Sequence, residues 1–443
     1  MPGLRSSPPE AGRALSLVRT AALTVIDLAP VVAHVLGNGL RVRVLPDRLV
    51  PAVSCYTFFG VGSRNERPGI TGISHLFEHM MFNGSERFGP KEFDRVLEAH
   101  GGASNAYTSN DVTAYHEDFP TEALEVVLEL ESDRMRALRI TPEGLEQERG
   151  VVMEERRLRT ENSHFGLLEE ELESLVFRAH PYRWPVIGWM DDIARIGRDD
   201  CLAFFRTYYA PGNASIYVCG DVDPDDLLRR IEAAYGTIPA GPPVPPHVGG
   251  EPPQRGERRA VVRHPANAPA MLAGFRGPAA RDPDTAVLDV LQACLSMGEG
   301  SRLRRRLVQE TELAVSVGVG WNWRADPGVF MFSMELAPGA SPRKAEAALW
   351  TEIDRVASRG VTEREMARAR ALLRSGVLHE MSTRNGIAHA LGQAEALLGD
   401  WREAGQGLVR YRAVTREDVR RAARRWLDPT HRNVVWLEPG AAP

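Results

Sequence analysis

The chain has 443 residues, of which 43% are hydrophobic and 26% are charged, and its formal net charge is −5. This length exceeds one ordinary core and predicts two domains of moderate size. The 54 basic residues, all arginine except Lys91 and Lys344, are interleaved with 59 acidic residues, so the charge pattern excludes a nucleic-acid-binding stripe. No paired C-x-x-C spacing occurs, and free buried thiols are expected for the four cysteines, Cys55, Cys201, Cys219 and Cys294.

The first thirty residues contain a moderately apolar stretch, residues 14–30, which Arg19 and Asp27 interrupt. No small-residue cleavage site follows a clean hydrophobic run, so a secretory signal is not predicted. Early prolines disfavour the amphipathic helix of a mitochondrial presequence. No segment is long and apolar enough to cross a membrane, and the expected location is the bacterial cytoplasm.

The segment T-G-I-S-H-L-F-E-H-M-M-F, which begins at Thr71, is predicted to be a helix because its apolar residues recur at helical spacing. Thr71 is expected to cap its start. His75 and His79 then lie on one face with Glu78 beside them. Two imidazoles so placed suit a catalytic Zn²⁺, and H-x-x-E-H is a zinc-protease signature in which the glutamate accepts the proton of a water. The segment therefore predicts a zinc site with its own general base.

Residues 103–119 are predicted to form a hairpin, because Thr, Val and Tyr lie on either side of an Asn110-Asp111 turn. An exposed edge strand captures an extended peptide through backbone hydrogen bonds. The alternative is an ordinary sheet edge, which residue propensity does not distinguish.

Residues 143–161 are predicted to form a strongly charged helix that contains candidates for a third metal ligand. Glu148 and Glu155, two turns apart, share a face, so that one can bind the metal and the other can support the site. The alternative is a solvated surface helix, because arginines are interleaved with the glutamates.

Pro and Gly dominate residues 239–257, which are predicted to be an extended linker between two halves. The halves also repeat: residues 193–219 align without gaps with residues 411–437, and in both an amphipathic helix leads through a Pro turn into a strand. This predicts duplicated α+β domains, each a sheet covered by helices, with boundaries at residues 1–238 and 258–443.

The H-x-x-E-H segment and the charged segment that contains Glu148 and Glu155 resemble those of the inverzincin metallopeptidases of the pitrilysin, insulin-degrading enzyme and mitochondrial processing peptidase family. The resemblance is in particular to the family's short bacterial zinc-bearing subunits. The resemblance implies two mainly antiparallel sheets, covered by helices, that face each other across a cavity. It implies that Glu155 in E-R-G-V-V-M-E-E is the third zinc ligand, with Glu154 as its nearest competitor. Glu148 takes the position of the family's supporting carboxylate, and Asn105 and Ala106 match its substrate-contacting positions.

The second half contains no H-x-x-E-H motif, so catalysis is expected in the first half. Active single-chain or homodimeric relatives have an Arg and a Tyr after a stretch like S-R-L, and the corresponding residues here are Val308 and Val315. A valine cannot donate to a developing oxyanion. The resemblance therefore implies a heterodimer in which a homologous partner subunit supplies the Arg/Tyr pair.

The expected function is that of a zinc-dependent endopeptidase subunit that hydrolyses extended peptides or unfolded segments. Two alternatives are a noncatalytic scaffold, like the core subunits of respiratory complexes, and a homodimeric peptidase that needs no partner. His75, Glu78, His79 and Glu155 argue against the scaffold, because such subunits typically lose ligands or base.

Overall fold

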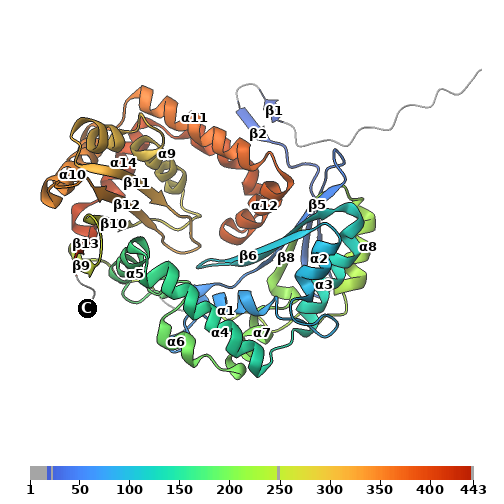
Figure 1. The fold of residues 1–443 in the computed structure, drawn as a ribbon. Helices are drawn as coiled ribbons and strands as arrows, with labels where there is room; N and C mark the ends of the chain where they lie inside the picture. Colours follow the sequence, from blue (N-terminus) through green and yellow to red (C-terminus); the bar gives the residue numbers. More distant parts are fainter. Residues whose placement is uncertain (1–16, 21–22, 247–249, 441–443) are drawn as a thin grey trace, which may run out of the picture.

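A computed structural model describes residues 17–20, 23–246 and 250–440, which form two large sheets with helices packed around them (Figure 1). A small hairpin, β1 (Leu17–Thr20) and β2 (Leu23–Ile26), precedes the first sheet. The expectation that residues 1–30 contain no secretory signal concerns residues that mostly lie outside the described ranges. In the described part of the chain, no helix is long and apolar enough to cross a membrane.

The first sheet has six strands in the order β3-β4-β8-β5-β7-β6, and only β4 and β8 pair in parallel. Strand β6 is therefore an edge strand, as the hairpin prediction requires, and it pairs with β7 from Ala103↔Asp118 to Thr108↔Thr113. The strand bounds are β3 Val32–Val35, β4 Arg41–Pro46, β5 Ala52–Phe59, β6 Ala103–Thr108, β7 Thr113–Pro120 and β8 Ala214–Gly220.

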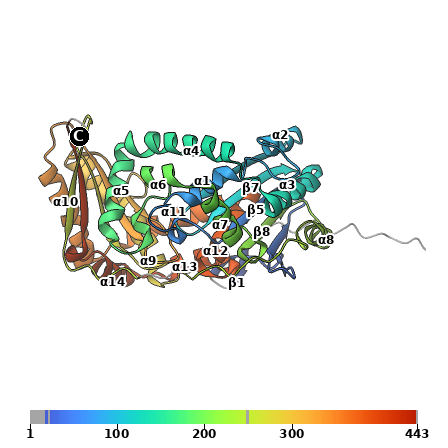
Figure 2. The same ribbon diagram turned by 90° about the horizontal axis from the view of Figure 1, so that it is seen from below.

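Within the described residues, eight α-helices belong to the first half of the chain, and the apolar faces of all except α5 pack in one core with the inner face of the sheet. Helix α5 packs instead in a cluster with strands of the second sheet. Figure 2 shows α4 lying along one side of the molecule between α5 and α2. The helix bounds are α1 Ile73–Met80, α2 Glu92–Ala99, α3 Leu124–Ala137, α4 Pro142–Arg156, α5 His164–Val176, α6 Met190–Arg195, α7 Arg198–Tyr208 and α8 Pro224–Tyr235.

The second sheet has five strands in the order β11-β12-β10-β13-β9, again with one parallel pair, β13 and β9. Its core is formed with α9, α10, α11 and α14. The bounds are β9 Arg258–His264, β10 Ala270–Arg276, α9 Asp284–Ser296, β11 Ala314–Trp321, β12 Val329–Leu336, α10 Pro342–Arg359, α11 Glu363–Glu380, α12 Arg384–Leu398, α13 Gly407–Ala413, α14 Arg416–Trp426 and β13 Asn433–Pro439.

The repeat read from the sequence is present in the structure, because α7 leads into β8 and α14 leads into β13 through a short turn that begins at a proline. Each of these strands is the parallel partner of its sheet's first long strand, β4 in one half and β9 in the other. The predicted α+β class, with two sheet-and-helix halves, is confirmed.

In each half, one helix also packs against the sheet of the other half. Helix α5 packs on β10 and β13 of the second sheet, and α12 packs on β5 and β8 of the first. At the second contact, a Cβ on Gly392 would lie 2.1 Å from Phe58 Cε2, so only glycine allows this approach. Glu395 of the same helix pairs with Arg43 at 3.0 Å and accepts a hydrogen bond from the Tyr217 hydroxyl. The two halves are therefore interlocked through their cores.

The described part of the linker, residues 239–246 and 250–257, contains neither helix nor strand. It is nevertheless attached to the fold, because the Glu251 carboxylate accepts hydrogen bonds from three successive backbone N–H groups, those of Arg178, Ala179 and His180. We propose that residues 1–238 and 258–443 are two domains joined by this segment. The four cysteines are free and buried, as expected.

Candidate metal centre

Helix α1 is held by its apolar face, which leaves its polar face beside two cavities. Leu76, Phe77 and Met80 are completely buried, and Phe77 packs against the rings of Phe204 and Tyr209. Because residues three and four apart share a helical face, burial of this stripe turns the two histidines and Glu78 to the opposite side. The amphipathic pattern of the sequence therefore orients the candidate ligands.

The start of α1 differs from the prediction that Thr71 caps it. The N-cap is Gly72 in the left-handed region, with φ 87°, and a Cβ there would lie 2.3 Å from the Ile187 carbonyl oxygen. The Thr71 hydroxyl instead donates to Asp192 at 2.7 Å. The Glu66 carboxylate accepts hydrogen bonds from the backbone N–H groups of Gly72 and Ser74, both at 2.9 Å. The Glu66 carboxylate, from outside the helix, thus satisfies backbone donors that an N-cap side chain usually satisfies.

Helix α4 brings two carboxylates to the histidines of α1. Glu155 Oε2 lies 3.8 Å from His75 Nε2 and 3.4 Å from His79 Nε2. Glu148, two turns earlier on the same face, lies 3.4 Å from the other nitrogen of His79, Nδ1. Its position is that of a carboxylate that orients a ligating imidazole and sets its tautomer.

The structure separates Glu155 from its neighbour Glu154. The Glu154 side chain is 73% exposed and pairs with Arg157, whereas the Glu155 side chain is 17% exposed and faces the histidines. Successive residues on a helix point about 100° apart, so one helix position can face α1 only if the next does not. Arg159 pairs with the other oxygen of Glu155 at 3.0 Å.

The chemistry of this cluster fits a zinc ion. One donor atom from each of His75, His79 and Glu155 lies within 4.8 Å of the other two, and no other such group of three occurs in the described residues. His75 Nδ1 is buried and has no hydrogen-bond partner among the described residues. Two imidazole nitrogens and one carboxylate are the donor set of catalytic zinc sites that keep one position for water.

The electrostatics of the cluster favour a cation among these side chains. Burial lowers the pKa of His75 to about 4, with a contribution from His79. Although burial opposes it, hydrogen bonding to Glu148 and Glu155 raises the pKa of His79 to about 9. Hydrogen bonding to His79 in turn lowers the pKa of Glu155. The protonated His79 between two carboxylates carries the positive charge that a metal would bring.

Glu78 is positioned by the edge strand. The Thr108 hydroxyl, on the last residue of β6, donates to Glu78 Oε2 at 2.5 Å. Burial raises the pKa of Glu78, and this hydrogen bond opposes that shift. On the same strand, Asn105 is exposed, and its side-chain oxygen accepts a hydrogen bond from the Ala106 backbone N–H. The base and the peptide-binding candidates thus belong to one strand and the helix beneath it.

Two cavities adjoin the cluster. One, of about 700 Å³, is lined by Glu78, His79 and Glu148 together with α2 and the strand residues Asn105 and Ala106. The other, of about 370 Å³, is lined by His75, Thr108 and Glu155, and the second half contributes Asn322 and Arg324 to its wall. An extended chain lying along β6 would therefore pass the cluster from one cavity into the other.

The second cavity has an acidic wall. It is lined by four glutamates, of which Glu170 pairs with Arg156 and Glu173 pairs with Arg324. Glu169 has no ion pair within the part of the chain that the structure describes. Its charge therefore faces the cavity uncompensated by a direct partner.

The two positions expected to correspond to the family's Arg and Tyr lie in the second half. Val308 is on the π-helical turn Arg304–Glu310, and Val315 is 53% exposed at an irregularity of β11, the edge strand of the second sheet. The nearby Arg305 and Arg306 pair with Glu310. These arginines therefore belong to a local surface cluster.

The two halves and the histidine-carboxylate cluster define a class of two-domain, zinc-protease-like proteins. The family model described as insulinase (peptidase family M16) matches residues 44–188, and the model described as the peptidase M16 inactive domain matches residues 195–373. The chain belongs to the insulinase family, peptidase family M16.

Named relatives agree with this assignment. The chain is 30% identical to the zinc protease PqqE of Helicobacter pylori over 91% of this chain and 92% of that protein. It is 24% identical to a probable mitochondrial-processing peptidase subunit beta of Arabidopsis thaliana, over 88% of this chain and 75% of that one. The crystal structure of a protease from Helicobacter pylori superposes with a TM-score of 0.89 at 27% identity, over 92% of this chain and 99% of that one.

Sequence reasoning missed three features of this centre. Thr108 lies in the predicted hairpin, but no pattern links it to Glu78, which is thirty residues earlier. Arg159 is one of many arginines of the charged helix, and the sequence does not single out its pairing with Glu155, four residues earlier. The uncompensated Glu169 is on another helix, α5, and only packing brings it to the cavity.

Proposed function

We propose that this chain is a zinc-dependent endopeptidase subunit that hydrolyses extended peptides or unfolded segments, and that it needs a partner subunit for full activity. The observation that carries the proposal is the meeting of His75, His79 and Glu155 with Glu78 held beside them. The relatives named as zinc proteases support the same chemistry.

His75, His79 and Glu155 would hold the zinc, and Glu148 would orient His79. When bound, zinc supplies Lewis acidity, which lowers the pKa of a coordinated water and polarises a carbonyl oxygen. Glu78 accepts the proton of the attacking water and then donates it to the leaving amine. Burial, which raises the pKa of Glu78, favours this exchange because it makes the carboxylate a stronger base.

The edge strand β6 is the proposed platform for the substrate. A peptide that adds as a further strand forms backbone hydrogen bonds, which are indifferent to sequence, and cavities on both sides receive alternate side chains. Asn105 and Ala106 are the proposed contacts on β6. An extended conformation is required, so unfolded segments are better substrates than folded ones.

The need for a partner rests on Val308 and Val315. Neither side chain donates a hydrogen bond, and loss of one oxyanion donor commonly costs about a hundredfold in rate. A homologous subunit with Arg and Tyr at these positions would supply the missing donors. The alternative, a homodimeric peptidase, requires that another group of this chain serve in their place.

The test is cleavage of a quenched fluorescent peptide by the zinc-loaded chain, alone and mixed with a homologous subunit that has the Arg/Tyr pair. Glu78→Gln is the blank and is expected to lower the rate about a thousandfold or more while zinc stays bound. Glu154→Gln, which removes an exposed carboxylate nearby, is the matched control and is expected to cleave like the wild type.

Each outcome selects one proposal. Activity in the mixture alone, lost with Glu78→Gln, supports the split site. Equal Glu78-dependent activity in the chain alone would remove the need for a partner. Bound zinc without cleavage in either sample would favour the scaffold.

A further inference from the structure

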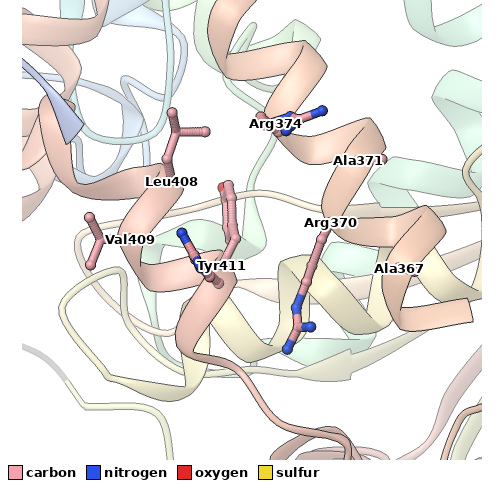
Figure 3. A pocket seen from close by; sticks show the side chains of 8 residues that line it. Ala367, Arg370, Ala371, Arg374, Leu408, Val409 and Tyr411 are labelled. Carbon is pink, nitrogen blue, oxygen red and sulfur yellow. The ribbon is translucent and has the colours of Figure 1, made fainter. Parts of the chain in front are cut away.

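A cavity of about 500 Å³ lies between α11 and α13 of the second half, and it shares no lining residue with the two cavities at the metal centre (Figure 3). Its α11 wall consists of Ala367, Arg370, Ala371 and Arg374, which recur at helical spacing and so share one face. The two alanines leave the room between the helices. We call this cavity the arginine cleft.

Helix α13 supplies the opposite wall, and the lining residues there are Leu408, Val409, Tyr411 and Arg412. Figure 3 shows the ring of Tyr411 between Leu408 and α11, with the guanidinium groups of Arg370 and Arg374 towards the two ends of the cleft. Tyr411 hydrogen-bonds to Asp289 of α9. The cleft therefore has an aromatic and apolar middle with cationic ends.

The charges of the arginine cleft are uncompensated. Three arginines and no acidic residue line it. Arg374 and Arg412 form no hydrogen bond or ion pair within the described residues. Arg370 donates to the Val414 carbonyl oxygen at 2.5 Å, which ties α11 to the end of α13, and its Nε has no partner in the part of the chain that the structure describes.

Several other arginines of this half form ion pairs with acidic residues. Arg302 forms two hydrogen bonds of 2.8 Å with Glu365 of α11, and Asp284 accepts hydrogen bonds from Arg421 and Arg425. Like charges around one cavity repel one another unless an anion binds between them. Solvation accounts for the exposed Arg374 and Arg412, whereas Arg370 is half-buried and its guanidinium is held by the Val414 carbonyl oxygen.

We propose that the arginine cleft binds a small oxyanion that carries several negative charges, with phosphate or carboxylate groups at its ends. Guanidinium groups present planar, forked donors that match both kinds of oxyanion. The spread of the cations along the cleft favours an elongated ligand over a single phosphate. Leu408 and Tyr411 would contact its middle. This proposal does not depend on peptidase activity, because none of these residues belongs to the metal centre.

The test is calorimetric titration of the full zinc-loaded chain with inorganic tripolyphosphate and, separately, with citrate. The variants are Arg374→Gln and Arg412→Gln, which remove exposed side chains without a partner and so leave folding intact. The control is Arg364→Gln, which removes an exposed charge from the same helix outside the cleft.

One anion is expected to bind per chain, with affinity falling as salt rises. Each cleft variant should weaken it about tenfold, the usual loss for one charge-assisted hydrogen bond, while Arg364→Gln should bind like the wild type. Tighter binding of tripolyphosphate identifies a phosphate ligand, and tighter binding of citrate identifies a carboxylate ligand. Absence of binding, or equal binding by all variants, would overturn the proposal, since the second result places the anion elsewhere, for example at the metal.

Discussion

The two sheets end in edge strands of very different character. Strand β6 of the first sheet lies above a helix with two histidines and a glutamate, and its last residue hydrogen-bonds to that glutamate. Strand β11 of the second sheet follows a π-helical turn and presents an exposed valine, Val315. Both halves repeat the same architecture, including the parallel pair beside a helix-turn-strand unit. The two halves therefore differ in a few side chains on a shared fold, and those side chains form the candidate metal centre.

Removing the Glu155 carboxylate, which α4 brings to the histidines, is expected to have the largest effect on the difference between the two halves. Glu155→Gln is expected to lower zinc affinity at least about a hundredfold, because loss of a direct ligand costs more than loss of a supporting group. Glu154→Gln should retain one zinc per chain. Elemental analysis after competition with a chelator measures both. Zinc retained in Glu155→Gln and lost in Glu154→Gln would reverse their roles.

The contact between β6 and the base can be broken without touching a ligand. Thr108→Val keeps the shape of the side chain but removes the donor to Glu78, and kcat is expected to fall roughly tenfold to a hundredfold, in line with hydrogen bonds to charged groups. Thr108→Ser should restore most of the rate. Steady-state kinetics of the active assembly, with zinc content measured in parallel, provide the check. A rise in KM alone, or loss of zinc, would assign Thr108 a different role.

The acidic cavity that the two halves share gives a sharper test of their cooperation. Glu169→Gln is expected to reduce a preference for peptides with a Lys or Arg side chain about fivefold to tenfold, since it removes the charge that has no partner there. Glu171→Gln, on the same helix but outside the cavity, is the control. Paired peptides that differ by Arg against Gln measure the preference. Unchanged ratios in Glu169→Gln would exclude charge recognition by this wall.

A buried carboxylate of the second half is predicted to affect only stability. Burial raises the pKa of Asp289 to about 7, and Trp323 Nε1 donates to it at 3.1 Å. Its pKa is higher in the folded state than in the unfolded chain, where it is about 3.9, so the folded state binds the proton more tightly. This contribution to stability is present at low pH and is lost as the pH rises from about 4 to about 7.

Asp289→Asn is therefore expected to remove about 2–3 kcal/mol of the difference in unfolding free energy between pH 5 and pH 8, while keeping an acceptor for Trp323. Urea unfolding of the wild type and the variant at both pH values measures this difference. Identical pH dependence in the two proteins would show that Asp289 is ionised throughout this range.

Local patterns in the sequence determined a large part of this protein. Helical periodicity predicts that His75, Glu78 and His79 share the free side of a buried helix, because the faces of a helix of eight residues are set by local spacing alone. The hairpin of β6 and β7 and the repeated helix-turn-strand units follow from turn residues and strand propensity. The prediction that Thr71 caps α1 was wrong, because the Thr71 hydroxyl donates a hydrogen bond to Asp192 instead.

The side chains that meet α1 are set by tertiary packing. It brings Glu155 rather than Glu154 to the histidines, Thr108 to Glu78, and α12 of the second half to the first sheet. Such contacts depend on how helices and strands far apart in the sequence approach and rotate against one another, which side-chain packing sets. The arginine cleft has the same origin: its spacing on α11 is visible in the sequence, but the approach of α13 makes it a cavity.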